Sequence, residues 1–414
     1  MNIRRFAACF VCAASGVLWR SSVKDFTYCA PTKVVFGRGV EAQAGSLLKE
    51  AGAKCALVHY GKASAVKSGL LSRVISSLES SGICHVELGG VAANPRLSLV
   101  REGIALCRER GVDFLLAVGG GSVIDSAKAI GYGAVYQGDV WDLYLKKTPP
   151  RASLPLMAVP TIAAAGSEMS DSSVITNEEG WLKRGLSSPW GRARFALVNP
   201  ELTFTLSKWQ SMCGCVDIMM HTMERWFSPE EDSDLTDSLA ASLLKAVMRA
   251  ATAVLQNPTD YNARSELSWA ASLSHNGLTG CGRSGDWACH QLEHEISGMF
   301  DVAHGAGLSA IWASWAHHVM PSNPSRFAKF ACEVMAVPFD AAAPTRVACE
   351  GIERTEAFFR SLNMPTRISE LGVTLDEEAI KTLAFKCSFE GTRTIGGIAR
   401  LDQADMEAIY RAAR

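Results

Sequence analysis

The sequence predicts an α/β N-terminal domain with a mostly parallel, Rossmann-like sheet, followed by an all-α C-terminal domain. From Phe26 to about residue 206, short apolar strands alternate with amphipathic helices, which is the arrangement of right-handed βαβ units. Two of these strands run into turns rich in glycine and other small residues. From Ser207 onward, apolar residues recur at helical spacing and β-branched runs are few, a pattern typical of packed helices.

The composition is that of a packed globular enzyme. The 414 residues are enough for two domains with sizeable cores. A hydrophobic content of 48% and a charged content of 20% are wrong for a disordered chain. The formal net charge of -1 gives no sign of a nucleic-acid or anionic-membrane partner. The 13 cysteines are odd in number and lack a regular spacing, so we expect a reducing compartment.

Residues 1–24 differ from the rest of the chain. Arg4 and Arg5 precede an apolar run from Phe6 to Trp19, and no acidic residue occurs before Asp25. The run is too short to span a bilayer comfortably. A signal peptide, a transit peptide and an extension without function all fit this pattern. We expect a cytoplasmic protein, or an organellar or exported one if residues 1–24 are a targeting peptide.

The expected elements of the first half follow the chain in a regular order of strands and helices. Asn199–Ser207 then marks a boundary, because a proline and a short extended run precede the first long helical pattern. The expected elements are a strand at 33–37, a helix at 40–51, a strand at 55–61, a helix at 67–81, a strand at 85–91, a helix at 93–111 and a strand at 113–122.

Two strand ends carry turns that suit a phosphate group. The first is Gly61-Lys62-Ala63-Ser64, small residues with one cation, and the second is the run Gly119–Lys128. Consecutive glycines let backbone N–H groups approach a pyrophosphate, and the helix that begins near Ser122 adds its positive N-terminal end. A tight strand-to-helix turn without a ligand is the alternative, and the G-x-G-x-x-G fingerprint is absent. Asp125, one turn into the helix, favours the nucleotide.

The segment Pro155–Thr176 comes next and begins as a strand. Its Ala-Gly-Ser centre is small enough to line a cleft. Thr161 and Ser167 are candidate hydrogen-bond donors within that cleft.

The stretch from Asp217 to His304 holds one carboxylate and several imidazoles. Asp217 and His221 are four residues apart, as are His290 and His294, so on helices each pair shares a face. Imidazoles with one carboxylate suit a divalent transition metal. A single histidine of this kind is more often a satisfied core or surface residue, but five of the nine histidines fall between His221 and His304. We therefore expect a nucleotide-binding domain over residues 25–206 and a helical metal-binding domain over residues 207–414.

A rival motif lies inside the same stretch. His290-Gln-Leu-Glu-His294 matches H-x-x-E-H, the inverted zinc-peptidase pattern, in which both histidines bind zinc and the glutamate acts on water. A peptidase would lose hydrolysis on Glu293→Gln, whereas the other metal site predicts that Glu293 is dispensable for metal binding. The nucleotide-type turn of the first half argues against a peptidase.

Together these motifs resemble the iron-containing (group III) alcohol dehydrogenases, and within them the NADPH-dependent butanol dehydrogenase-like aldehyde reductases. The resemblance covers about Phe26 to Arg414. It implies a dehydroquinate synthase-like architecture, a homodimer, and hydride transfer between NADP(H) and a short-chain aldehyde or primary alcohol. The motifs that carry it are PTKVVFGRG, GGGSVIDSAK, AGSEMSDSSVITN, NPELTFTLS, VDIMMHTMERW, DWACHQLEHEISGMFDVAHGAGLSAI and TIGGIARL.

The resemblance also implies a role for each candidate site residue. His294 is then a non-ligand beside the nicotinamide and substrate that relays a proton, with mere packing as the alternative. The implied ligands of a divalent ion, Fe²⁺ or Zn²⁺, are Asp217, His221, His290 and His304. The implied cofactor contacts are Gly61, Lys62, Ala63, Ser64, Gly120, Gly121, Ser122, Asp125, Thr161 and Lys183.

Two departures from the family pattern affect selectivity. Thr161-Ile162 stands where the family usually has two threonines, and Cys215–His221 keeps both ligands but enlarges their neighbours. The turn Gly61–Ser64 has no acidic residue to bind a ribose 2′-hydroxyl, and its Lys62 favours NADP(H) over NAD(H). A lysine that simply points to solvent is the alternative.

Three other functions remain open at this level. A sibling polyol dehydrogenase and a phosphate-eliminating sugar synthase use the same scaffold, but the run HQLEHEISGMFDVAHG fits the alcohol dehydrogenase pattern better. A metal- or nucleotide-binding protein without catalysis is disfavoured, because the four implied ligands and the glycine turn are all present.

Overall fold

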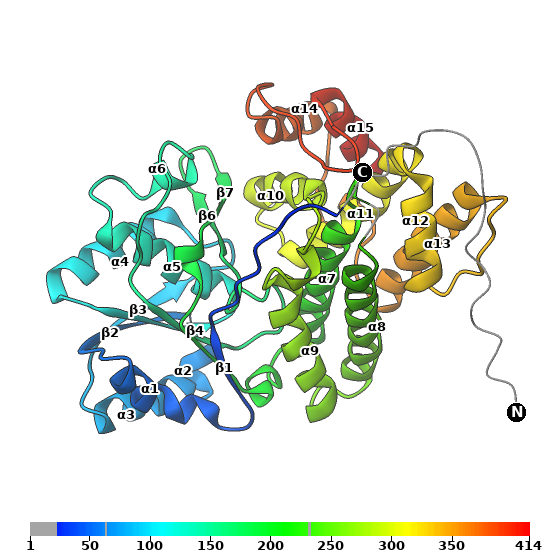
Figure 1. Ribbon diagram of the computed structural model, residues 1–414. Coiled ribbons are helices and arrows are strands. Elements are labelled where there is room, and N and C mark those ends of the chain that lie inside the picture. Colours follow the sequence, from blue (N-terminus) through cyan, green and yellow to red (C-terminus); the bar gives the residue numbers. More distant parts are fainter. Residues whose placement is uncertain (1–22, 63, 231–232) are drawn as a thin grey trace, which may run out of the picture.

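The computed structural model describes residues 23–62, 64–230 and 233–414 (Figure 1). A six-stranded parallel sheet with flanking helices forms the N-terminal half, and helices form the C-terminal half, so the predicted fold class is confirmed. The leader predicted over residues 1–24 lies almost wholly outside the described residues, and so does Ala63. The division after residue 206 stays a prediction; the last strand ends at Val198 and the first long helix begins at Lys208.

Strands and helices alternate through the α/β half. The strands are β1 Lys33–Phe36, β2 Cys55–Gly61, β3 Cys84–Val91, β4 Phe114–Gly119, β5 Leu156–Pro160, β6 Ser172–Asn177, β7 Leu182–Ser187 and β8 Phe195–Val198. The helices are α1 Ala44–Glu50, α2 Ser64–Lys67, α3 Leu70–Ser80, α4 Leu97–Arg110, α5 Gly121–Val135 and α6 Trp141–Tyr144. β6 and β7 form an antiparallel hairpin apart from the main sheet, which the sequence pattern did not predict.

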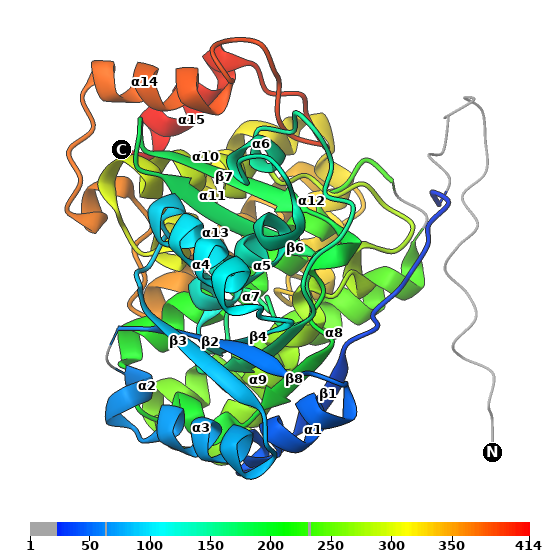
Figure 2. The ribbon, with the colours of Figure 1, turned by 90° about the vertical axis from the view of Figure 1, so that its left-hand side faces the viewer.

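The main sheet is buried on both faces. Its order is β1-β8-β5-β4-β2-β3, and all neighbouring strands are parallel. Figure 2 shows α4 and α5 on one face and α1 and α3 on the other. Along β4, Leu115 and Ala117 pack in the core under α4 and α5, while Leu116 and Val118 pack in the core over α1 and α3. Burial on both faces explains why β4 reads as an uninterrupted apolar run.

The strand order reverses between β2 and β4. From β2 the chain goes outward to the edge strand β3, and it then returns to β4 on the other side of β2. Tyr60 of β2 pairs with Val118 of β4, so the two glycine turns that follow these strands emerge side by side. In open α/β sheets, ligands bind at the carboxyl ends of the strands at such a reversal. The topology therefore joins the two turns that the sequence marked separately.

The helical half packs around α7. Its helices are α7 Lys208–Trp226, α8 Asp234–Gln256, α9 Tyr261–His275, α10 Ala288–Phe300, α11 His304–Val319, α12 Pro324–Glu333, α13 Pro344–Ser361, α14 Glu377–Cys387 and α15 Gln403–Ala413. By length and composition alone α8 is apolar enough to cross a membrane. Its stripe of Ala240, Leu244, Val247 and Ala251 is nevertheless buried in the common core, as in a core helix.

Small residues let the two halves meet closely. Gly214 of α7 packs against the segment after β5, and a Cβ there would lie 2.1 Å from the carbonyl oxygen of Ala163. Gly166 has a φ of +65°, and its Cβ would lie 2.1 Å from the carbonyl oxygen of Ala271 in α9. The small residues of the segment after β5 therefore allow the helical half to pack closely against the α/β half. A cavity of about 920 Å³ remains between the two halves.

A buried ion-pair network holds the end of α7. The Asp237 carboxylate lies 2.6 Å from Arg283, 2.6 Å from Arg326 and 2.7 Å from Lys329. Arg283 also donates to the carbonyl oxygen of Arg225. Burial alone would raise the pKa of Asp237, but its cationic partners, Arg326 first, outweigh burial and bring that pKa to about 2.

Asp237→Asn is expected to lower the free energy of unfolding by roughly 3–5 kcal/mol, because it leaves two buried guanidinium groups without their counter-ion. Urea unfolding followed by circular dichroism measures the change. Asp234→Asn on the same helix is the control, since Asp234 pairs with the same lysine but its side chain is 92% exposed. Equal effects of the two substitutions would contradict the importance of the buried network.

Candidate metal centre and cofactor cleft

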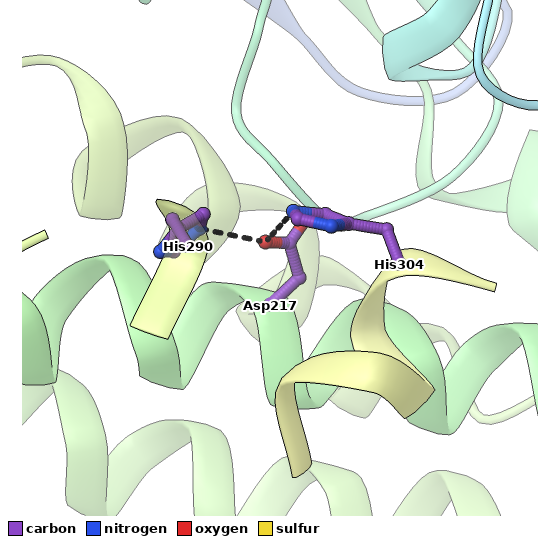
Figure 3. A group of neighbouring side chains, drawn as sticks. All are labelled: Asp217, His290 and His304. Carbon is purple, nitrogen blue, oxygen red and sulfur yellow. Dashed lines mark ion pairs between the residues drawn. The ribbon is translucent and has the colours of Figure 1, made fainter. Parts of the chain in front are cut away.

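Three helices bring the predicted metal ligands to the cavity wall. α7 supplies Asp217 and His221 one turn apart, α10 supplies His290 and His294, and α11 begins at His304. All five side chains line the cavity. Figure 3 shows Asp217 between His290 and His304, with ion pairs to both.

The donor atoms have the spacing that one ion requires. Asp217 Oδ1 lies 3.4 Å from His221 Nδ1, 3.7 Å from His290 Nε2 and 3.7 Å from His304 Nε2. Two ligands that each bind one tetrahedral ion at about 2.1 Å lie about 3.4 Å apart. Asp217 Oδ1, His221 Nδ1 and His290 Nε2 are buried without a hydrogen-bond partner in the described structure. Such atoms are costly unless something binds them, so the donor set fits a divalent ion.

Two buried carboxylates contact the imidazoles of His290 and His304 at the ring nitrogen that faces away from Asp217. Glu224 contacts His290 at Nδ1 and also accepts the backbone N–H of His290 at 3.2 Å. Glu293 contacts Nδ1 of His304. Burial would raise the pKa of Glu293, but His304 and Lys183 outweigh burial and bring that pKa to about 2. Carboxylates that hold one ring nitrogen leave the other free for a metal, which is a common arrangement around metal-binding histidines.

His294 stands apart from the Asp217 group. The ligand atoms of Asp217, His290 and His304 all lie within 4.8 Å of one another, and His294 belongs instead to a second such group with Glu293 and His304. The His294 ring centroid lies 5.7 Å from that of His304 and 6.4 Å from that of His290. An H-x-x-E-H peptidase needs both of its histidines on one ion, and the structure places His290 in the first group of ligand atoms and His294 in the second. The geometry therefore disfavours the peptidase.

The second glycine turn borders the same cavity. Gly120 precedes α5, and no side chain caps the N-terminus of that helix. Gly120, Gly121 and Ser122 line the cavity, so the uncapped backbone N–H groups are available to an anion. A Cβ on Gly120 would lie 2.8 Å from Ile162, which means that the departure from the family's second threonine packs directly against this turn.

Asp125 also lines the cavity, but both of its oxygens are occupied. Oδ1 accepts from Ser167 Oγ at 2.7 Å, and Oδ2 accepts from the backbone N–H of Val174 at 2.9 Å. Burial raises the pKa of Asp125, against the opposing effect of Lys128. The visible role of this carboxylate is to tie α5 to the segment that leads into β6.

The first glycine turn lies beyond the cavity lining. Gly61 ends β2, Lys62 is exposed, and Ser64 begins α2. In the part of the chain that the structure describes, these three residues and Thr161 do not line the cavity. The backbone N–H of Thr161 donates to the carbonyl oxygen of Gly119 at 3.1 Å, so this residue helps to hold the second glycine turn in place.

Lys183 contacts the metal side of the cavity, and its implied contact with the cofactor stays a prediction. It lies on β7 and lines the cavity, but its Nζ donates to Ser297 Oγ at 2.7 Å and lies 3.5 Å from Glu293. Because Glu293 holds His304, Lys183 is the third member of a chain that ends at a metal donor. The lysine therefore supports the metal side of the cavity.

Family models match most of this chain. A model described as iron-containing alcohol dehydrogenase matches residues 31–200, and the C-terminal model of the Fe-containing alcohol dehydrogenase family matches residues 211–414. The chain belongs to the iron-containing alcohol dehydrogenase family. It is therefore an oxidoreductase, and the family that the motifs resembled is confirmed.

Similar members of this alcohol dehydrogenase family span the same length. Probable NADH-dependent butanol dehydrogenase 1 of Bacillus subtilis is 38% identical, over 94% of this chain and 100% of the relative. NADPH-dependent aldehyde reductase YqhD of Escherichia coli is 30% identical, over 95% and 100%. The crystal structure of NADH-dependent butanol dehydrogenase A from Thermotoga maritima has a TM-score of 0.91 at 34% identity, over 95% and 99%.

Sequence reasoning missed four residues that this alcohol dehydrogenase site contains. Glu224 follows His221 by three residues, a helical spacing that marked it as a neighbour of the ligand face. The remaining three come from separate segments and border the cavity around His221; they are Arg225, His275 and Trp287.

Glu293→Gln is expected to weaken metal binding roughly 10- to 100-fold, because it removes the charged partner of His304. The sequence pattern predicts that Glu293 is dispensable for metal binding, whereas its contact with His304 predicts that it contributes, and this variant distinguishes the two. Competition with a chelator of known affinity measures the dissociation constant of Zn²⁺. Glu295→Gln is the matched control, since it lies on the same helix but its carboxylate pairs with Arg184. Equal affinities of the two variants would show that Glu293 does not orient a ligand.

Proposed function

We propose that this chain is a metal-dependent alcohol dehydrogenase and aldehyde reductase that transfers a hydride between NADP(H) and short-chain aldehydes or primary alcohols. One observation carries the proposal: the Asp217 donor cluster and the Gly120–Ser122 turn line one cavity. A nicotinamide nucleotide at the turn and a carbonyl at the donors would share that space. Relatives named butanol dehydrogenase and aldehyde reductase support this substrate class.

The donor set suits the chemistry of carbonyl reduction. A divalent ion, Fe²⁺ or Zn²⁺, held by the Asp217 cluster would supply Lewis acidity at the aldehyde oxygen, where negative charge develops. Glu224 and Glu293 hold the histidines of that cluster in the orientation that binding requires. The uncapped end of α5 offers backbone N–H groups to the pyrophosphate, and the cofactor provides the hydride.

His294 is suited to passing a proton. Burial lowers the pKa of His294 well below its ordinary value of 6.5, and Lys183 and His304 lower it further. The imidazole is therefore neutral near pH 7, with one nitrogen that donates and one that accepts. A neutral ring that lines the cavity can accept a proton from water as it delivers one to the substrate oxygen.

The experiment that tests the proposal measures consumption of reduced nicotinamide by the purified protein with butanal and other short aldehydes. The protein is compared as apoprotein and after reloading with Fe²⁺ or Zn²⁺, with NADPH or NADH. We expect turnover only in the metal-loaded protein. Failure to reduce any aldehyde despite bound metal and nucleotide would overturn the proposal, and oxidation of vicinal diols alone would favour a polyol dehydrogenase.

His294→Ala is the informative variant in this assay. It is expected to keep its metal, because His294 lies outside the Asp217 group, but to lose turnover roughly 100-fold or more. Metal content by elemental analysis and turnover are measured on one preparation. Loss of metal together with activity would show that His294 is a ligand.

The preference for NADP(H) rests on the turn after β2. Lys62 is exposed at the carboxyl end of the strand beside the order reversal, where the adenosine ribose of a dinucleotide is held in such sheets. A lysine there attracts a 2′-phosphate, and the turn has no carboxylate to bind a 2′-hydroxyl. Relatives with either cofactor in their names exist, so this residue offers a reason to choose between them.

Lys62→Asp is expected to lower the ratio of kcat/KM with NADPH to that with NADH by at least about tenfold, because a carboxylate repels the 2′-phosphate. Steady-state kinetics with butanal measures the ratio. Lys67→Asp, the same charge change at the end of α2, is the control. An unchanged ratio in Lys62→Asp would mean that Lys62 only points to solvent.

A further inference from the structure

Arg225 is a buried cation on the wall of the catalytic cavity. It lies in the last turn of α7, four residues after His221, and its side chain is only 8% exposed. His275, the last residue of α9, and Trp287, which precedes α10, line the cavity beside it. None of these three residues has a role in the proposed metal or cofactor binding.

The guanidinium is held by the protein but not saturated. Its Nη1 donates to the carbonyl oxygen of His221 at 2.6 Å and to that of Ser274 at 3.0 Å, and its Nη2 lies 2.9 Å from His275 Nδ1. A guanidinium has five N–H groups. Two of them, one on Nε and one on Nη2, have no acceptor among the described residues.

Arg225 also has no counter-ion. Among the residues that the structure describes, no carboxylate oxygen lies within 4.0 Å of its guanidinium. The charges of Asp171 and Glu224 favour the charged guanidinium without touching it, and each carboxylate is paired elsewhere, Asp171 with Arg192 at 3.1 Å and Glu224 with His290. Burial lowers the pKa of Arg225 to about 10, so the group still carries its charge near pH 7. A buried charge without a contacting counter-ion is costly, which indicates that the site receives an anion from outside.

Trp287, which packs against the Arg225 guanidinium, has a strained backbone conformation. Trp287 has a φ of +68°, a left-handed conformation that is strained for a tryptophan. That conformation sets the indole ring 4.5 Å from the Arg225 guanidinium and 6.2 Å from the His221 ring. The His275 and His221 ring centroids are 4.0 Å apart, so a single imidazole separates the cation from a metal donor.

We propose that Arg225, with His275 beside it, binds the carboxylate of a substrate whose aldehyde carbon lies at the metal donors. The proposal rests on the proposed function and narrows its substrate class to short aldehydes that carry a carboxylate. Two free N–H groups on adjacent guanidinium nitrogens match the two oxygens of such a group. Because only one imidazole lies between cation and donor, the carboxylate and carbonyl are a few carbons apart. Neutral aldehydes leave the cation unpaired and are the poorer substrates.

The test compares acid aldehydes with neutral ones of the same chain length. The metal-loaded enzyme with NADPH is assayed on 4-oxobutanoate and 5-oxopentanoate, and on butanal and pentanal. We expect kcat/KM to favour the acids, and Arg225→Gln to lower that preference roughly 10- to 100-fold, mainly through KM. Arg393→Gln is the control, because Arg393 lines the same cavity but its guanidinium stacks on Phe389. Reduction of the neutral aldehydes without a preference for the acids would overturn this proposal and leave the proposed function intact.

A binding measurement tests the proposal even if the protein reduces none of these aldehydes. Glutarate and its neutral diamide are titrated into the metal-loaded protein with NADP⁺ while tryptophan fluorescence is recorded, because Trp287 contacts Arg225. We expect the dicarboxylate alone to bind the native chain, and Arg225→Lys to keep more of that binding than Arg225→Gln. If Arg225→Gln does not fold, the native chain still decides. Equal binding of the diacid and the diamide, or of neither, would overturn the proposal even in a protein that reduces no aldehyde.

Discussion

The close approach of α11 to α7 and α10 is the constraint on which the site depends. His304 opens α11, and its imidazole reaches Asp217 only when the backbone of α11 lies against α7. Gly305 permits this contact, because a Cβ there would lie 2.1 Å from a carbonyl oxygen of α7. Gly307 leaves room for Glu293, whose side chain would otherwise lie 2.8 Å from a Cβ. The glycines after His304 therefore serve helix packing around the metal donors.

The run Gly119–Lys128 of the α/β half also contains residues with different structural roles. Its glycines border the cavity with their backbone, whereas the charged side chains of the helix that follows make hydrogen bonds to other segments of the chain. Asp125 accepts from residues in the segment 167–174, and Lys128 Nζ donates to the carbonyl oxygens of Ser170 and Ser172. Both side chains tie α5 to the approach to the β6–β7 hairpin. The motif therefore has two functions. Its glycine backbone can bind an anion, and the side chains of Asp125 and Lys128 hold α5 in position.

Local pattern was enough to predict the α/β and helical halves and to select candidate metal ligands that the structure brings to one cavity wall. Asp217 and His221, four residues apart on one helix, needed no tertiary information to be paired. The partners of the donors were different, because no spacing says which imidazole a carboxylate reaches until α7, α10 and α11 are packed. Glu293 lay in a motif that suggested another enzyme, and the contact of Lys183 with Glu293 could not be predicted because nothing local shows that β7 packs on α10. Arg225 and His275 meet across 50 residues of chain.

The chain of contacts from Lys183 through Glu293 to His304 crosses from one half of the molecule to the other. Asn94 and Arg96 of the α/β half also cross, and both bind Asp301 just before α11. A hinge motion that opens the cleft would break contacts that orient a metal donor. If a nucleotide closes the two halves, nucleotide binding and metal binding would be linked, and by reciprocity each would strengthen the other. An ion held by these donors would then dissociate most slowly while a nucleotide is bound.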